Sequence, residues 1–182
     1  MDSSERNLFV QRLRETRATF LASLQDVSEE QGPFKPVPDR WSIQDCVEHI
    51  ALVEHGLFRQ ISENWSPAAT PFGAEKERLI LNSGGGDRQK KVQSPERTQP
   101  TGRFGSLEEA ASQFSAARDR TIAWVTACND DLRMRSTAHP LLGLMSCAEL
   151  LAFIVVHPLR HVQQIAEIKQ GAGYPGPQAG RA

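Results

Sequence analysis

Residues 146–170 have the sequence SCAELLAFIVVHPLRHVQQIAEIKQ, which predicts a long amphipathic helix. Ser146 and Glu149 form the capping box that is typical of a helix start, and Gly171 is a typical stop. One face of this helix would carry aliphatic residues and two histidines, namely Leu150, Ile154, His157, His161, Ile165 and Ile168. Because residues i and i+4 lie on the same helix face, His157 and His161 could hold one metal ion between them.

Three earlier segments also have apolar residues at helical spacing, so the sequence predicts an all-α protein folded as a four-helix bundle. These segments are residues 4–28, 42–63 and 106–128, with Ser4, Ser42 and Ser106 as predicted N-caps. Glu109 would complete a full capping box with the third of these caps, and Asp45 would form a weaker version of it with the second. Residues 129–145 are expected to form turns, because no alternating strand pattern is visible in the sequence.

The connection between the second and third helices is unusually long. Residues 66–105 are rich in proline and glycine, contain the basic run 88–91, and predict a crossover with a short helix at 74–81. Two helices that run parallel need such a connection, whereas the basic run is expected to be solvated surface. Residues 1–172 are therefore expected to be a single domain, followed by an irregular tail at 173–182.

Two charged residues fall inside apolar stripes. Glu54 lies in the stripe of the second helix and Arg118 lies in the stripe of the third. An unpaired buried charge is costly, so the sequence predicts that these two side chains pair in the core. The alternative is that one or both extend to the surface.

Composition argues against several classes of function. The formal net charge of the 182 residues is -1, so neither nucleic acid nor an anionic membrane is an expected partner. The start of the chain is polar, and no run of about 18 apolar residues is present, so neither a signal peptide nor a spanning helix is expected. The cysteines form no CxxC pair and suit a reducing cytoplasm; they are Cys46, Cys128 and Cys147.

His49 is the candidate third ligand, because it lies at the edge of the apolar stripe of the second helix. Zinc held by three imidazoles keeps a fourth position for water or substrate, where it can lower the pKa of water to about 7 or deprotonate a thiol. Two histidines at helical spacing are a weak signal alone, because a histidine on an apolar face is often an ordinary core residue. Pro158 replaces the glutamate of HExxH, which excludes that metalloprotease motif, and the paired Glu-x-x-His motifs of di-iron bundles are missing.

Several neighbouring residues have open roles. His55 is expected at the surface, and His139 is expected to pack a loop, with a place at the pocket rim as its alternative. Cys46 is a less favoured additional ligand. Pro158 cannot donate to the carbonyl of Ile154, so we expect a kink there and a hydrogen bond from an imidazole N–H to that carbonyl.

The order of these motifs resembles the DinB/YfiT-like superfamily over nearly the whole chain. The motifs are Trp41-Ser42-Ile43, Glu48-His49-Ile50, the crossover stretch from Val92 to Arg103, His139-Pro140 to Gly143, and His157-x-x-Arg160-His161-x-x-Gln164-Ile165. The resemblance implies an up-down-down-up-like bundle with its long crossover between helices 2 and 3. It also implies a metal site formed by His49, His157 and His161, a zinc or nickel ion, and a homodimer.

The resemblance leaves three functions open. The first is a thiol-dependent transferase that joins a low-molecular-weight thiol, such as bacillithiol or mycothiol, to a small-molecule electrophile; a thiol-dependent isomerase is also known in the family. The second is a metal-dependent hydrolase, which ranks lower because no Glu or Asp adjoins either histidine of the last helix. The third is a non-catalytic helical module with a structural metal or none. DNA binding is not implied, because no basic face with interleaved aromatic residues is visible.

Overall fold

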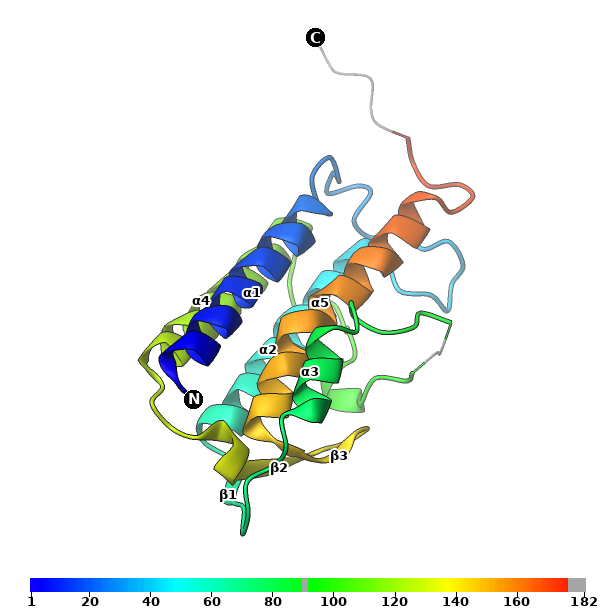
Figure 1. The fold of residues 1–182 in the computed structure, drawn as a ribbon. Helices are drawn as coiled ribbons and strands as arrows, with labels where there is room; N and C mark the ends of the chain where they lie inside the picture. The colour runs from blue at the N-terminus through cyan, green and yellow to red at the C-terminus, as the bar shows by residue number, and fades with distance from the viewer. Residues whose placement is uncertain (90–91, 177–182) are drawn as a thin grey trace.

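A computed structural model describes residues 1–89 and 92–176 of the chain. Its four long helices are α1 (Ser3–Ala22), α2 (Ile43–Ser62), α4 (Leu107–Ala127) and α5 (Cys147–Lys169). In Figure 1, α1 and α5 run upward and α2 and α4 run downward, so the chain follows an up-down-down-up path. The predicted all-α four-helix bundle is confirmed.

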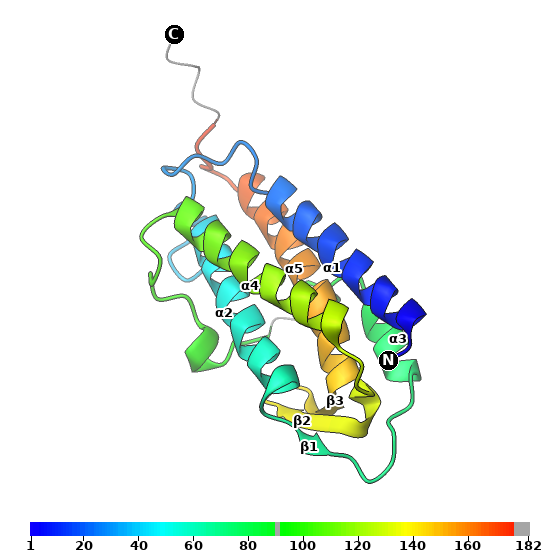
Figure 2. The ribbon, with the colours of Figure 1, turned by 90° about the vertical axis from the view of Figure 1, so that its left-hand side faces the viewer.

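The long crossover connects the parallel helices α2 and α4 around the outside of the bundle (Figure 2). It contains the short helix α3 (Glu75–Leu81), which packs against α5, and the 3-10 turn η1 (Glu96–Thr98). The short helix predicted at 74–81 is confirmed within one residue. Residues 90–91 of the basic run and residues 177–182 of the predicted tail lie outside the described residues.

A small antiparallel sheet caps one end of the bundle, where only turns were expected. Its strands are β1 (Ser66–Pro67), β2 (Arg135–His139) and β3 (Gly143–Ser146), in that order, and a 3-10 turn, η2 (Leu132–Met134), precedes β2. Ser136 is paired with Ser66 on one side and Ser146 on the other. The expectation of turns alone was wrong, because strands of two to five residues are too short to show an alternating pattern.

The helix caps agree with the sequence prediction at α2 and α5 and differ from it at α1 and α4. The capping boxes of α2 and α5 are complete. Helix α1 is instead capped by Asp2, whose carboxylate accepts the N–H of Glu5, and it ends at Ala22 rather than 28. Ser106 caps α4, but Glu109 accepts the N–H of Gly105, so the predicted box is incomplete. Three eligible caps in succession, Asp2, Ser3 and Ser4, explain why the start of α1 was misplaced.

Arg118 and Glu54 pair in the centre of the bundle, as predicted. The Nε and Nη2 atoms of Arg118 lie 2.6 and 2.7 Å from the two carboxylate oxygens of Glu54, and both side chains are buried. The remaining guanidinium N–H groups donate to the Leu13 carbonyl, to Thr16 Oγ1 and to the Ile154 carbonyl, at 3.0, 2.9 and 3.1 Å. All five N–H groups of the guanidinium therefore have acceptors, and these acceptors come from three other helices.

The Ile154 carbonyl shows that the expected imidazole contact was wrong. Pro158 cannot donate to this carbonyl, and Arg118 takes the free acceptor in place of a histidine. A charged guanidinium forms a stronger hydrogen bond than a neutral imidazole, which accounts for the partner. Helix α5 continues through Pro158, because the carbonyl that the proline leaves free is satisfied from outside the helix.

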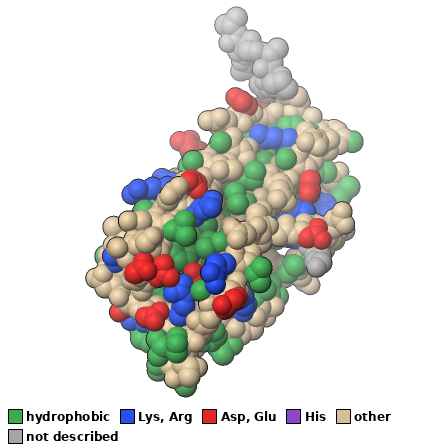
Figure 3. Space-filling view, in the orientation of Figure 1, with side chains coloured by type: hydrophobic (Ala, Val, Ile, Leu, Met, Phe, Trp, Pro, Cys, Tyr) green, Lys and Arg blue, Asp and Glu red, His purple; other side chains and the backbone are tan. Residues whose placement is uncertain are grey.

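No helix among residues 1–89 and 92–176 combines the length and apolarity that crossing a bilayer requires. Charged side chains of both signs are interspersed over the face in Figure 3. This mixture on the visible face agrees with the formal net charge of -1.

Replacing Arg118 by Met should lower the free energy of unfolding by about 3–5 kcal/mol, because the Glu54 carboxylate would stay buried without its partner. Urea denaturation measures this loss. The control is Arg59→Met, which removes an exposed pair with Glu63 and should cost less than about 1 kcal/mol. The double variant Glu54→Leu/Arg118→Met should be more stable than Arg118→Met alone. An equal loss in Arg59→Met and Arg118→Met would contradict the central role of the buried pair.

Candidate metal centre

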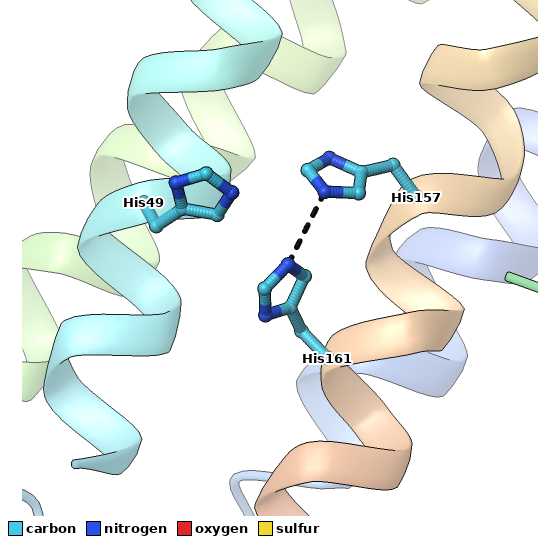
Figure 4. Close-up of side chains that lie close together, drawn as sticks. All are labelled: His49, His157 and His161. Atoms are coloured by element: carbon cyan, nitrogen blue, oxygen red, sulfur yellow. Dashed lines mark hydrogen bonds between the residues drawn. The ribbon is translucent and has the colours of Figure 1, made fainter. Parts of the chain in front are cut away.

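Three histidines converge between α2 and α5. His49 comes from the second turn of α2, and His157 and His161 come from successive turns of α5 (Figure 4). One ring nitrogen from each lies within 4.8 Å of the other two. The Nε2 atoms of His157 and His161 face each other at 3.2 Å. The structure thus brings together the three side chains that the sequence singled out.

The crossover determines the orientation of His49. Its Nδ1 atom lies 2.7 Å from the carbonyl oxygen of Thr98, and the hydroxyl of Ser94 lies 3.5 Å from the same nitrogen. A carbonyl oxygen only accepts hydrogen bonds, so Nδ1 carries the proton and Nε2 keeps its lone pair. The segment around η1 therefore covers one side of the histidine cluster, a point that the sequence left undecided.

Two aromatic side chains support the imidazole rings. Trp41 lies nearly parallel to the ring of His161, at 15° and 6.1 Å between centroids, and also contacts His49 at 4.8 Å. Phe153 stacks on His157 at 21° and 4.9 Å. These contacts restrict the ring planes and surround the nitrogens with apolar surface.

Burial keeps the three imidazoles neutral. Desolvation lowers the pKa of His49 to about 4, against a smaller opposing effect of its hydrogen bond to Thr98. Desolvation also lowers the pKa of His157 and that of His161 well below the usual range, and neighbouring histidines and arginines add to the effect. Near pH 7 each ring therefore has an unprotonated nitrogen, which is the form that binds a metal.

The donor set fits a divalent transition metal. Three neutral imidazoles without a carboxylate suit zinc or nickel, whereas calcium and magnesium require oxygen ligands. The two facing Nε2 atoms of His157 and His161 can share only one proton, and the Nδ1 atom of His161 is buried with no hydrogen-bond partner among the described residues. A cation between the two facing Nε2 atoms would bind both lone pairs and remove the need for a shared proton.

The other candidate residues lie outside the cluster. His55 is exposed, and its Nδ1 lies 3.0 Å from Nη2 of Arg120. His139 packs the β2–β3 turn as predicted, because its Nδ1 accepts the N–H groups of Leu141 and Leu142, each at 3.2 Å. Cys46 is fully buried and absent from the cluster, and desolvation raises the pKa of its thiol.

Two buried carboxylates near the histidines received no site role from the sequence. Glu54 lines a small cavity between α2 and α5 beside His157, and its oxygens accept from Arg118 and Thr121. Glu48 precedes His49 and accepts backbone N–H groups of the crossover. The sequence offered one signal for Glu48, namely an acidic residue next to the candidate ligand His49. It could not identify the partners of Glu48, because they lie more than fifty positions away in the chain.

Three comparisons with known proteins found matches to this chain. The model of the DinB superfamily matches residues 12–165. The uncharacterized protein YuaE of Bacillus subtilis (strain 168) is 23% identical over 156 residues, covering 86% of this chain and 94% of that protein. A solved structure of YfiT from Bacillus subtilis has a TM-score of 0.64 and 13% identity, covering 96% and 91% of the two chains. YfiT is described as a probable metal-dependent hydrolase with an unusual four-helix bundle topology, and the likeness shows a shared fold.

Protein purified without chelator or nickel column should contain about one transition-metal ion per chain, measured by elemental analysis. His161→Ala should lower zinc affinity by more than the roughly 10- to 100-fold that loss of an outer-shell partner costs. His55→Ala is the control and should bind zinc like the wild type, because His55 lies outside the cluster. Equal zinc affinity of His161→Ala and the wild type would rule out this site.

Proposed function

The chain belongs to the DinB superfamily, and from this we propose that it is an enzyme that uses a divalent metal ion held by His49, His157 and His161. The observation that carries the proposal is the convergence of three buried, neutral imidazoles from α2 and α5. The donor set supports zinc or nickel. Such an ion, when bound, supplies Lewis acidity that lowers the pKa of a thiol or water at the coordination position that the protein leaves open.

The surroundings support a thiol-dependent transferase best. A hydrolase benefits from a general base that activates water, whereas a thiolate is already the nucleophilic form. Both buried carboxylates near the histidines are engaged: Glu54 accepts from Arg118 and Thr121, and Glu48 accepts from backbone amides. The thiol would lose its proton to solvent on binding the ion. Attack of the thiolate on a carbon that bears a leaving group then forms the carbon–sulfur bond and breaks the bond to that group, which departs as an anion, so no general base is needed.

The chain's own side chains would hold and shield the reactants. Trp41 and Phe153 restrict the imidazole planes and limit the access of water. Beside His157, a cavity with room for about one water molecule lies between α2 and α5, so it marks a gap in the packing next to the site. The apolar residues that line it are Ile50, Val53, Leu57, Ile154 and Pro158.

A metal-dependent hydrolase is the second candidate, because the structurally similar YfiT is described as probably having that activity. It would use the same three histidines and a water molecule in place of the thiol. The two activities differ in their requirement for a thiol, so one set of assays separates them.

Zinc- or nickel-loaded protein should conjugate a model aromatic electrophile with at least one low-molecular-weight thiol faster than buffer does. His161→Ala should return the rate to that of buffer, and His55→Ala should keep the wild-type rate. Absorbance of the conjugate measures turnover for a panel that includes cysteine, glutathione and bacillithiol. Ester hydrolysis without thiol, in place of conjugation, would favour the hydrolase. Absence of both activities and of bound metal would favour a non-catalytic helical module.

A homodimer in a reducing cytoplasm is the remaining part of the proposal. All three cysteines are free, which supports a reducing compartment.

The β2–β3 hairpin exposes about half or more of Leu141, Leu142 and Leu144, which supports an apolar contact between two copies. Leu142→Glu/Leu144→Glu should therefore shift the mass measured by light scattering from dimer to monomer. A dimer mass in this variant would exclude the hairpin as the interface.

A further inference from the structure

We propose that Glu48 is a positioning residue that holds His49 in its metal-binding orientation by anchoring the crossover. The inference rests on the proposed function, because the ring that Glu48 positions is the proposed metal ligand. Glu48 does not touch the other two histidine rings in any described contact. Its effect on His49 passes through residues 94–103, which contact both side chains.

The first step is the anchor itself. The Glu48 side chain is buried, with 1% of its residue surface exposed. Its Oε1 accepts the N–H of Thr101 at 2.9 Å, and its Oε2 accepts the N–H groups of Gly102 and Arg103 at 3.0 and 3.2 Å. Gly102 has a φ of 74°, which lets successive N–H groups curl around one carboxylate. Three charge-assisted hydrogen bonds therefore fix one end of the segment on α2.

The second step is the internal bonding of residues 94–103. These hydrogen bonds join Ser94 Oγ to Thr98 Oγ1 at 2.8 Å, Thr98 Oγ1 to the Pro95 carbonyl at 3.0 Å, Gln99 Nε2 to the Ser94 carbonyl at 3.0 Å, and Arg103 Nη1 to the Arg97 carbonyl at 3.4 Å. The last of them connects the anchored end to the turn η1. The segment therefore transmits the position of its anchor to the Thr98 carbonyl.

The third step is the contact with His49. The Thr98 carbonyl lies 2.7 Å from Nδ1, so it holds the proton on that nitrogen and leaves the Nε2 lone pair for the metal. Glu48 and His49, which are consecutive in α2, thus bind the same crossover segment at two places. Without the carboxylate of Glu48, the segment would move away from α2 and the Thr98 carbonyl would no longer select this tautomer.

The test compares Glu48→Ala and Glu48→Gln with Glu29→Ala. Glu29 serves as the control, because its carboxylate, although exposed, also accepts two backbone N–H groups. These belong to Leu107 and Glu108 at the start of α4, at 2.8 and 3.0 Å. Zinc affinity should fall about 10- to 100-fold in Glu48→Ala, as for loss of other outer-shell partners, and at most a few-fold in Glu29→Ala. Long-range ¹⁵N NMR of the metal-free protein should show the second His49 tautomer in the Glu48 variants alone.

Amide exchange supplies an independent measure of the anchor. Exchange at Thr101, Gly102 and Arg103 should be faster in both Glu48 variants than in the wild type. If Glu48→Ala does not fold, Glu48→Gln decides, because it keeps the side-chain shape and one acceptor oxygen. Wild-type His49 tautomer and zinc affinity in a folded Glu48 variant would overturn the inference. Absence of zinc binding by the wild type would overturn the proposed function, while the His49 tautomer would still decide the role of Glu48.

Discussion

The buried guanidinium of Arg118 is the interaction on which the arrangement of the helices depends. A charge in a protein interior is tolerated only when its hydrogen-bonding groups are all paired, and here the partners come from α1, α2 and α5. Its planar geometry fixes where Glu54 and the Leu13 carbonyl must lie. The relative height of the four helices is therefore set by polar geometry as well as by apolar packing.

The same interaction connects the core to the histidine cluster. Glu54 lies about one and a half turns beyond His49 on α2, and the Ile154 carbonyl lies one turn before Pro158 on α5. Arg118 binds both groups and so holds α2 against α5 near the level where the three histidines meet. Pro158 contributes by leaving the Ile154 carbonyl free, and a residue that would otherwise weaken α5 becomes part of the contact between helices.

The crossover has a second role that follows from the path of the chain. Parallel α2 and α4 require a long connection, and this one lies against the histidine cluster. Glu48 holds the crossover by three backbone amides, and Thr98 meets His49. Scaffold residues thus orient the rings for the metal ion that we propose they bind.

The sequence by itself determined the features that depend on local spacing or on a charge inside an apolar stripe. These are the four helices, the capping boxes of α2 and α5, the placement of His157 and His161 on one helix face, and the pairing of Glu54 with Arg118. Only the tertiary structure decided three features. They are the short sheet, the hydrogen bond from Arg118 to the Ile154 carbonyl, and the hydrogen bonds that join the crossover to Glu48 and His49. The physical reason is that the β1–β2 pairing, the Arg118 bond and the crossover contacts join groups 36 to 70 positions apart, often through backbone atoms that every residue shares.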